Sequence, residues 1–132
     1  MSAPNIISAS TVNGKTTYYT PSGTTAVVLL TNASGSGKVL KINQIVCANV
    51  NGSAAVNATV AIYTNGGVAQ GSAPSGGSSY PIISTVSVPA NAALIAVDKT
   101  TAIYLEEDKC ISVTSGTASG ITYSISYEEI SS

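Results

Sequence analysis

The sequence predicts an all-β fold: a single antiparallel β-sandwich, jelly-roll-like, of about eight strands, with an extended N-terminal arm. In the closing run ITYSISYEEI, the apolar residues Ile121, Tyr123 and Ile125 alternate with Thr and Ser. A period of two is typical of a strand with one buried face. Val, Ile, Thr and Tyr dominate the other periodic segments, which recur about every ten residues. No helical apolar spacing persists beyond one turn, so we expect strands throughout.

The chain divides into an arm, residues 1–14, and a sandwich domain, residues 15–132. The arm has room for one short strand at residues 6–8 and ends at the turn dipeptide Asn13-Gly14. In the domain, clusters of Gly, Pro, Asn and Ser separate the periodic runs. The expected strands are residues 15–20, 25–31, 38–50, 56–64, 81–88, 92–97 and 103–105, one through Ile111 and Val113, and one that begins at Ile121.

Residues 38–50 carry the longest strand signal. The apolar residues at even positions from Leu40 to Val50, Val46 among them, share one parity, so we expect them on one face. An Asn-Gly turn signal separates this run from residues 56–64, which alternate in the same way. Two alternating runs joined through Asn-Gly predict a β-hairpin.

Residues 65–79 (NGGVAQGSAPSGGSS) are predicted as a long loop because they are rich in Gly and Ser. Loops longer than about 12–15 residues are uncommon inside compact domains and are usually functional or mobile. We therefore count this loop among the features that bear on function.

Charged residues make up only 8% of the chain, whereas about 25% is usual. A free monomer normally keeps a charged surface, so a surface of Ser, Thr, Ala and Asn favours coverage by other protein. Five scattered Lys residues form no stripe for nucleic acid, and no apolar run is long enough to cross a membrane. The N-terminus lacks the basic start and apolar centre of a signal peptide, which predicts synthesis in the cytoplasm.

The composition also argues against catalysis. The chain has no His and no Arg, so it lacks the usual triad base and the usual phosphate clamp. Its six carboxylates lie in connections or at a strand end, and we expect neither an enzyme nor a cofactor. The run Glu106-Glu107-Asp108 has ligands suited to Ca²⁺, but its spacing matches no defined loop. An exposed acidic turn is the favoured interpretation.

Two residue types remain to be placed. Cys47 and Cys110 lie in expected strands of a chain without an export signal, which favours two reduced thiols over a disulfide. Tyr side chains serve as core, as protein interface or as a stacking platform for sugars. Strand patterns place Tyr63, Tyr123 and Tyr127 in or near the core and leave Tyr18, Tyr19, Tyr80 and Tyr104 for the surface.

Three segments, KVLKINQIVCANVNG, SVPANAALIAVDKTTAIYLEEDKCISVTSG and ITYSISYEEIS, together resemble small β-sandwich virion proteins of tailed bacteriophages, including those that infect cyanobacteria. The resemblance covers residues 25–130. It implies no catalytic residues. It implies a capsid decoration (cement) protein or an accessory tail or neck protein.

We therefore expect a virion protein, made in the host cytoplasm, that stabilises a phage capsid by bridging its subunits. The expected partners are the major capsid protein or other virion proteins, with neither nucleic acid nor membrane. A closed homotrimer is the expected assembly, because it would cover charge-poor faces. The expected interface residues are Ile6, Ile7, Tyr18, Tyr19, Tyr80, Thr122, Ser124 and Ser126. The alternatives are a tail, collar or fibre-base component and a carbohydrate- or receptor-binding module.

Overall fold

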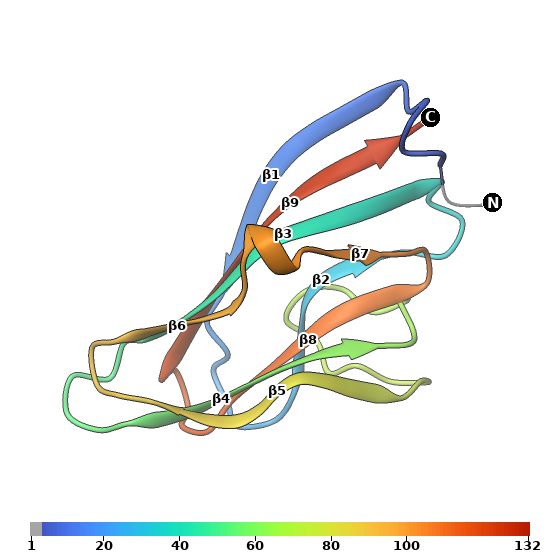
Figure 1. The fold of residues 1–132 in the computed structure, drawn as a ribbon. Helices are drawn as coiled ribbons and strands as arrows, with labels where there is room; N and C mark the ends of the chain where they lie inside the picture. The colour runs from blue at the N-terminus through green and yellow to red at the C-terminus, as the bar shows by residue number, and fades with distance from the viewer. Residues whose placement is uncertain (1–3) are drawn as a thin grey trace.

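The computed structural model describes residues 4–132 and shows two antiparallel sheets packed face to face, as Figure 1 illustrates. This confirms the predicted all-β sandwich. The elements are β1 (Thr11–Tyr19), β2 (Val27–Asn32), β3 (Lys38–Asn49), β4 (Val56–Tyr63), β5 (Ser79–Val88), β6 (Ala93–Val97), the short 3₁₀-helix η1 (Lys99–Thr101), β7 (Ile103–Leu105), β8 (Lys109–Ser115) and β9 (Ile121–Ser131).

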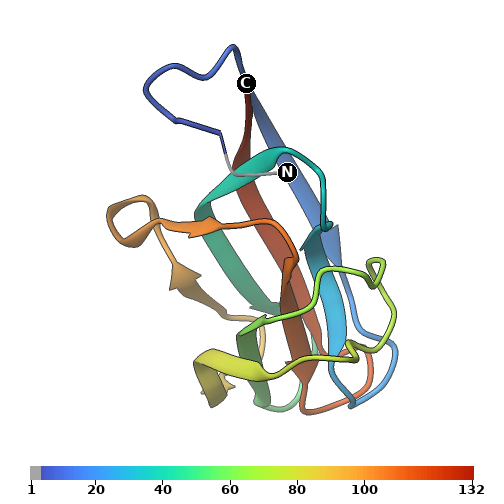
Figure 2. The ribbon, with the colours of Figure 1, turned by 90° about the vertical axis from the view of Figure 1, so that its right-hand side faces the viewer.

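Most consecutive strands lie in different sheets, and only the pairs β4–β5 and β6–β7 stay within one sheet. Sheet A has the order β1-β9-β3-β6, with β7 also paired to β3, and sheet B has the order β2-β8-β4-β5. The last strand, β9, lies between β1 and β3, so the two ends of the described chain meet in sheet A, as Figure 2 also shows. Nine strands form among residues 4–132, where the sandwich was expected to have about eight, and β6 and β7 lie on either side of η1, as expected for residues 92–97 and 103–105.

The core lies between the sheets. Ile121, Tyr123 and Ile125 of β9 are fully buried there, which confirms the alternation predicted for this strand. Sheet B supplies the facing residues, among them Val60 and Val113. Aliphatic side chains from both sheets thus form one continuous cluster, which is the usual core of a β-sandwich.

The hairpin predicted between residues 38–50 and 56–64 is wrong. β3 belongs to sheet A and β4 to sheet B, and the chain crosses between the sheets over residues 50–55. The buried side chain of Asn49 holds this crossing, since its Nδ2 donates to Ala54 O (3.0 Å) and Val88 O (2.8 Å). Asn-Gly here belongs to a crossover and not to a hairpin turn.

The single face predicted for the even positions of β3 is also wrong. A register shift between Ile42 and Gln44 inserts Asn43, which has no partner on β9. A bulge of this kind exchanges the faces of the residues beyond it. Leu40 and Ile42 therefore point into the core, as do Ile45 and Cys47, while Val46 points outward and is only half-buried.

The arm is shorter than predicted. β1 begins at Thr11, and Asn13 and Gly14 pair with Glu129 and Glu128 of β9 instead of forming a turn. Pairing along the long β9 outweighs the local turn preference of Asn-Gly. Residues 6–8 form a turn rather than a strand, closed by a bond from Ile7 N to Asn5 Oδ1 (2.9 Å). The first three residues of the predicted arm lie outside the described range.

The predicted loop, residues 65–79, is confirmed with its bounds moved by one residue, because β4 ends at Tyr63 and β5 begins at Ser79, so that residues 64–78 contain neither helix nor strand. This segment lies on the outer side of sheet B, where Val68 packs against Val28, Tyr63 and Cys110. The Tyr63 hydroxyl donates to Gly77 O (3.0 Å) and accepts from Gly77 N (2.9 Å). The loop is therefore a packed cover for part of one side of the sandwich.

Candidate interaction surface

The side of sheet A that faces away from the core is the strongest candidate for a functional surface. We call it the sheet A outer face and define it by Thr16, Tyr18, Lys41, Val46, Ala48, Ile95, Tyr104, Thr122, Ser124, Ser126 and Glu128. All of these side chains are exposed or half-buried. Only near the end of the sheet are outward residues buried, at Val39 and Ile130.

One row of side chains crosses four strands of this face. Tyr18 is opposite Ser124, Ser124 is opposite Val46, and Val46 is opposite Ile95. Tyr18 is 70% exposed and Ile95 is 54% exposed, so the row ends in an apolar side chain at each side. Fully burying a side chain of this size contributes about 1.5–3 kcal/mol. The row thus offers a partner two apolar anchors.

Hydroxyl groups on either side of this row already bond to one another. Thr16 Oγ1 and Ser126 Oγ are 3.1 Å apart, and Thr20 Oγ1 and Thr122 Oγ1 are 2.8 Å apart. Removing water from a polar group costs less free energy when the group keeps a hydrogen bond within the protein than when it has no partner. The hydroxyl residues therefore lower the cost of covering this face.

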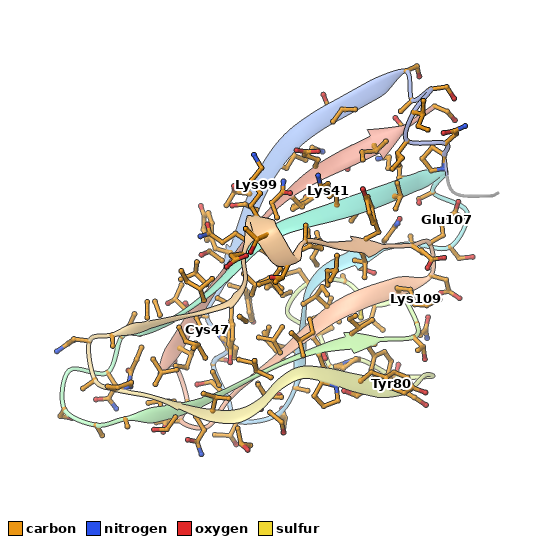
Figure 3. The ribbon with its side chains drawn as sticks, in the orientation of Figure 1. Lys41, Cys47, Tyr80, Lys99, Glu107 and Lys109 are labelled. Atoms are coloured by element: carbon orange, nitrogen blue, oxygen red, sulfur yellow. The ribbon has the colours of Figure 1, made fainter. Side chains whose placement is uncertain are left out.

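Charge on the sheet A outer face is limited to Lys41 and Glu128, which are opposite each other in the register. Asn43 Nδ2 also donates to Glu128 Oε1 (3.4 Å). Figure 3 shows Lys41 at the front of β3, beside η1. The face consequently carries one charge of each sign along its strands.

The other side of the sandwich differs, because the loop 64–78 covers part of it. Val28, Tyr63 and Cys110 point outward from sheet B and are nevertheless buried, with Val68 packed against them. Backbone bonds fix the loop to the sheet edge, from Val28 N to Ser72 O (2.9 Å) and from Gly71 N to Val28 O (2.8 Å). The loop thus covers one part of the outer side of sheet B, while Asn57 and Ser87 on the same side stay exposed, as does most of the sheet A outer face.

Only part of the predicted interface comes together. Tyr18, Thr122, Ser124 and Ser126 share the sheet A outer face. Tyr19 was predicted at the surface, but it has the opposite parity to Tyr18, is half-buried and packs against the core.

The other predicted interface residues lie elsewhere. Tyr80 is 61% exposed on β5 of sheet B, far from Lys41 in Figure 3. Ile6 and Ile7 are exposed in the turn before β1. The predicted set is thus divided among four places: the sheet A outer face, the border of the core at Tyr19, β5 of sheet B and the turn before β1.

Sequence reasoning missed Val46 and Ile95. The alternation placed Val46 on the same face as Leu40 and Ile42, whereas the bulge at Asn43 turns it to the opposite face. The sequence does contain a signal for this bulge. Gln44 interrupts the apolar residues at even positions, and the next apolar residues, Ile45 and Cys47, are at odd positions. Ile95 lies in a short run of apolar residues, AALIAV, that shows no alternation.

Of the three tyrosines predicted in or near the core, Tyr123 and Tyr127 face the core between the sheets, whereas Tyr63 points outward from sheet B under the loop 64–78. Tyr63 and Tyr123 are buried and Tyr127 is half-buried. The Tyr123 hydroxyl crosses to sheet B, where it donates to Thr114 O and accepts from Thr59 N (3.3 Å). Burial raises the pKa of Tyr123 well above its usual value. Tyr123 is therefore a structural link between the sheets.

The acidic turn binds backbone groups of two loops. Glu107 accepts from Gly35 N (2.9 Å) and Gly37 N (3.2 Å), and Asp108 Oδ1 accepts from Gly66 N (3.1 Å). These bonds attach the loop after β2 and the loop after β4 to the turn before β8. In the part of the chain that the structure describes, no three potential metal-ligating side chains lie together.

Both cysteines are free and buried in separate places. Cys47 points between the sheets, as Figure 3 shows, and Cys110 lies under the loop 64–78. Burial raises the pKa of the Cys47 thiol to about 12 and that of the Cys110 thiol to about 11. Since the thiolate is the reactive form, both groups are protected in the folded chain.

Residues 4–132 contain no detected pocket. Among the same residues there is no helix of the length and apolar character that crossing a bilayer requires. No family model matches the chain, and no curated protein is significantly similar to it.

Proposed function

We propose that this chain is a virion structural protein, a decoration (cement) protein of a tailed-phage capsid that bridges capsid subunits through the sheet A outer face. The observation that carries the proposal is the difference between the two sides of the sandwich. The loop 64–78 covers the part of the outer side of sheet B that Val28, Tyr63 and Cys110 form, whereas no loop of this kind covers the strands of the sheet A outer face. A surface left open in this way is where a partner of the same low charge would dock.

The chemistry of the sheet A outer face supports a protein partner. Interface cores are depleted in charge and enriched in aromatic residues, and apolar anchors contribute most of the binding energy. Tyr18 and Ile95 are such anchors, and the hydroxyls of Thr16 and Ser126 bond to each other between β1 and β9. The proposed partner is the major capsid protein, and the proposed location is the virion.

We further propose that the fold is a jelly roll in which β6 and β7 are two halves of one strand interrupted by η1. The strand orders β1-β9-β3-β6 and β2-β8-β4-β5 support this, because they interleave early and late strands within each sheet. Viral capsid and lectin domains are among the proteins built on double-sheet jelly rolls. The resemblance of residues 25–130 to phage virion proteins agrees with such an arrangement.

Ile95→Asp tests the docking surface. Placing a carboxylate among apolar contacts leaves a buried charge without a partner, which reduces affinity by about tenfold or more. We expect the variant to lose occupancy on capsids that lack the protein, measured by co-sedimentation. Ser87→Asp is the matched control, because Ser87 is exposed on β5 of sheet B. Equal occupancy of both folded variants, or no binding by the unmodified chain, would contradict the proposal.

A tail, collar or fibre-base protein would use the same kind of surface. The position of the protein in the virion separates this role from that of a capsid decoration protein. Antibodies against a tail, collar or fibre-base protein would label the tail or neck of the virion instead of the shell. Labelling confined to the tail would replace the capsid role with this one.

A sugar-binding role has less support from the positions of the tyrosines. Tyr18 lies on β1, Tyr104 on β7 across the sheet, and Tyr80 in sheet B, so the three exposed rings share no platform. Glycan-array binding that is lost on Tyr80→Ala would favour a carbohydrate-binding module instead.

A further inference from the structure

The edges of the two sheets are not equally protected. An edge strand exposes unpaired backbone N–H and C=O groups, and proteins block unwanted pairing with short strands, Pro, bulges, charges or a covering loop. In sheet B, the bonds between Val28 and residues 71–72 cover the edge of β2. The edge of β5 contains Pro81, two register shifts against β4 and Thr85 at φ +48°. Both edges of sheet B are therefore blocked.

One edge of sheet A is blocked and the other is open. β6 and β7 are short strands separated by η1, so they present no continuous edge. β1, in contrast, pairs with β9 from Thr11↔Ser131 to Tyr19↔Tyr123 without a register shift. Figure 1 shows β1 as the outermost strand of this sheet. Among the described residues, β1 is thus the longest regular edge left unpaired.

Two side chains near this edge do not close it. Lys15 is the one charged residue of β1, and its Nζ lies 3.3 Å from Glu129 Oε2, on the neighbouring strand β9 and away from the free edge. Gln70 donates to Leu29 O (2.9 Å) and to Thr17 Oγ1 (3.1 Å), but it reaches Tyr18 O only at 3.5 Å. That last distance is beyond the usual range of a hydrogen bond.

We propose that β1 pairs antiparallel with β1 of a second copy of this chain, around a two-fold axis at Thr16, so that the two A sheets form one continuous sheet. This inference stands independently of the capsid role proposed above. It concerns the edge of the sheet, whereas the capsid role concerns the sheet A outer face.

The register follows from two conditions. In an antiparallel pair, residues that are opposite each other point to the same side of the sheet. The outer faces of the two A sheets therefore continue into each other only when one residue of β1 is opposite the same residue of the second copy. The two-fold axis then passes between these two residues. An axis at Lys15 would pair two like charges, which is unfavourable. An axis at Thr16 avoids this and pairs residues 13–19 of both copies, more of β1 than an axis at Thr17 would pair. An axis at Gly14 would pair an equal length, residues 11–17, but it would leave the exposed Tyr18 without a partner on β1.

The side chains of this register fit one another. Tyr18 of one copy is opposite Gly14 of the other, and an aromatic ring placed across from an edge glycine fills the space that the glycine leaves. Lys15 is opposite Thr17, and the two Thr16 side chains meet at the axis. The exposed Tyr18 ring is thereby partly covered, and the edge carries no opposing like charges.

The geometry favours a dimer over the trimer predicted from the sequence. Identical edges that pair around a two-fold axis close after two copies. A trimer joined by strand pairing would need β1 to meet a different edge of the next copy, and the other edges are covered, interrupted or short. The dimer would double the sheet A outer face into one surface with two Tyr18–Ile95 rows.

Mass and cross-linking of the 132-residue chain test the proposal. Light scattering during gel filtration, over roughly 1–100 μM protein, is expected to give twice the 13.1 kDa of one chain. Under mild oxidation, Thr16→Cys is expected to form a disulfide-linked dimer, since paired Cα atoms are about 4.5–5.5 Å apart. Val12→Cys is the matched control, because Val12 is exposed on β1 but the two copies would lie about 27 Å apart.

Charge substitution at the same position adds a reversible readout. Thr16→Lys and Thr16→Glu are each expected to abolish the dimer through like-charge repulsion at the axis, and mixing the two variants is expected to restore it. Circular dichroism checks that each variant stays folded. A monomer or trimer mass for the unmodified chain, equal cross-linking of Thr16→Cys and Val12→Cys, or no recovery on mixing would each overturn the proposal. None of these results depends on capsid binding.

Discussion

Tyr123 joins the two sheets at the scale of a single residue. It belongs to β9 of sheet A, yet its hydroxyl bonds to Thr114 O of β8 and Thr59 N of β4, which are register partners in sheet B. The ring is fully buried, so no water replaces these bonds when the hydroxyl is removed. The side chain therefore contributes both apolar burial and a fixed position of one sheet over the other.

Tyr123→Phe tests this link. The substitution keeps the ring and leaves buried backbone groups with one bond fewer, a loss of about 1–3 kcal/mol per unsatisfied group. We expect the free energy of unfolding, measured with urea, to fall by that amount. Tyr18→Phe is the control, because the Tyr18 hydroxyl is on an exposed ring. A loss equal to that of Tyr18→Phe would contradict the structural role of the hydroxyl.

At the scale of elements, an ion-paired row fixes the three adjoining strands β1, β9 and β3. Glu129 of β9 lies between Lys15 of β1 and Lys38 of β3, with Nζ–Oε distances of 3.3 Å and 3.2 Å. Partial burial alone would raise the pKa of Glu129, but hydrogen bonds and charge from Lys38 and Lys15 outweigh it and hold this pKa below the usual 4.5. The carboxylate is thus stabilised in the folded chain.

The lowered pKa determines how stability depends on pH. The Glu129 carboxylate binds a proton less readily in the folded chain than in the unfolded chain. Its contribution to the free energy of unfolding is therefore present above the unfolded pKa of 4.5 and is lost as the pH falls through the lower folded value. The lysines are 47% and 40% exposed, so solvent screening limits the contribution to about 0.5–1 kcal/mol.

Glu129→Gln is expected to lose that contribution at pH 7 and to match the unmodified chain at strongly acidic pH. Urea unfolding at both pH values measures the difference. Glu106→Gln is the control, since Glu106 is exposed and lies outside the row. A difference in free energy of unfolding between Glu129→Gln and the unmodified chain that stayed constant as the pH fell would show that the ion pairs of Glu129 are not its cause.

The positions of strands are easier to predict from this sequence than their partners. The alternation of Ile121, Tyr123 and Ile125 marks β9 because burial of one face repeats every second residue. The hairpin prediction failed because the crossing between sheets depends on a long-range bond from Asn49 to Val88 O, which no local pattern encodes. The face of Val46 was missed for a similar reason, since one inserted residue, Asn43, exchanges the two faces.

On the scale of the whole molecule, low charge governs behaviour in solution. The chain has a net charge of −1 and a sequence pI near 5.1, with few charges to keep copies apart. Repulsion between copies vanishes when the net charge reaches zero. We expect static light scattering of a concentrated sample to peak near the pI. Ser87→Asp should move the peak to lower pH, and scattering that is flat across the acidic range would contradict the expectation.

The candidate surface could be predicted only in part because it depends on the whole sheet. Thr122, Ser124 and Ser126 were recognisable as one hydroxyl face, since they alternate within a single strand. Their neighbours Tyr18 and Ile95 come from residues far away in the chain and join the face only through the strand order. Tyr80, similar in type to Tyr18, lies in the other sheet for the same reason.

The position of β9 in the middle of sheet A affects how the chain is made. The ribosome synthesises β9 after the other eight strands, yet β1 has no other partner in the sheet. Until β9 emerges, β1 has both edges free, and Tyr123 is not yet present to join the sheets. Incomplete β-structures with open edges are prone to pair with other chains. The last strand therefore completes the sandwich, and a chain that stops before Ile121 would leave β1 unpaired on both sides.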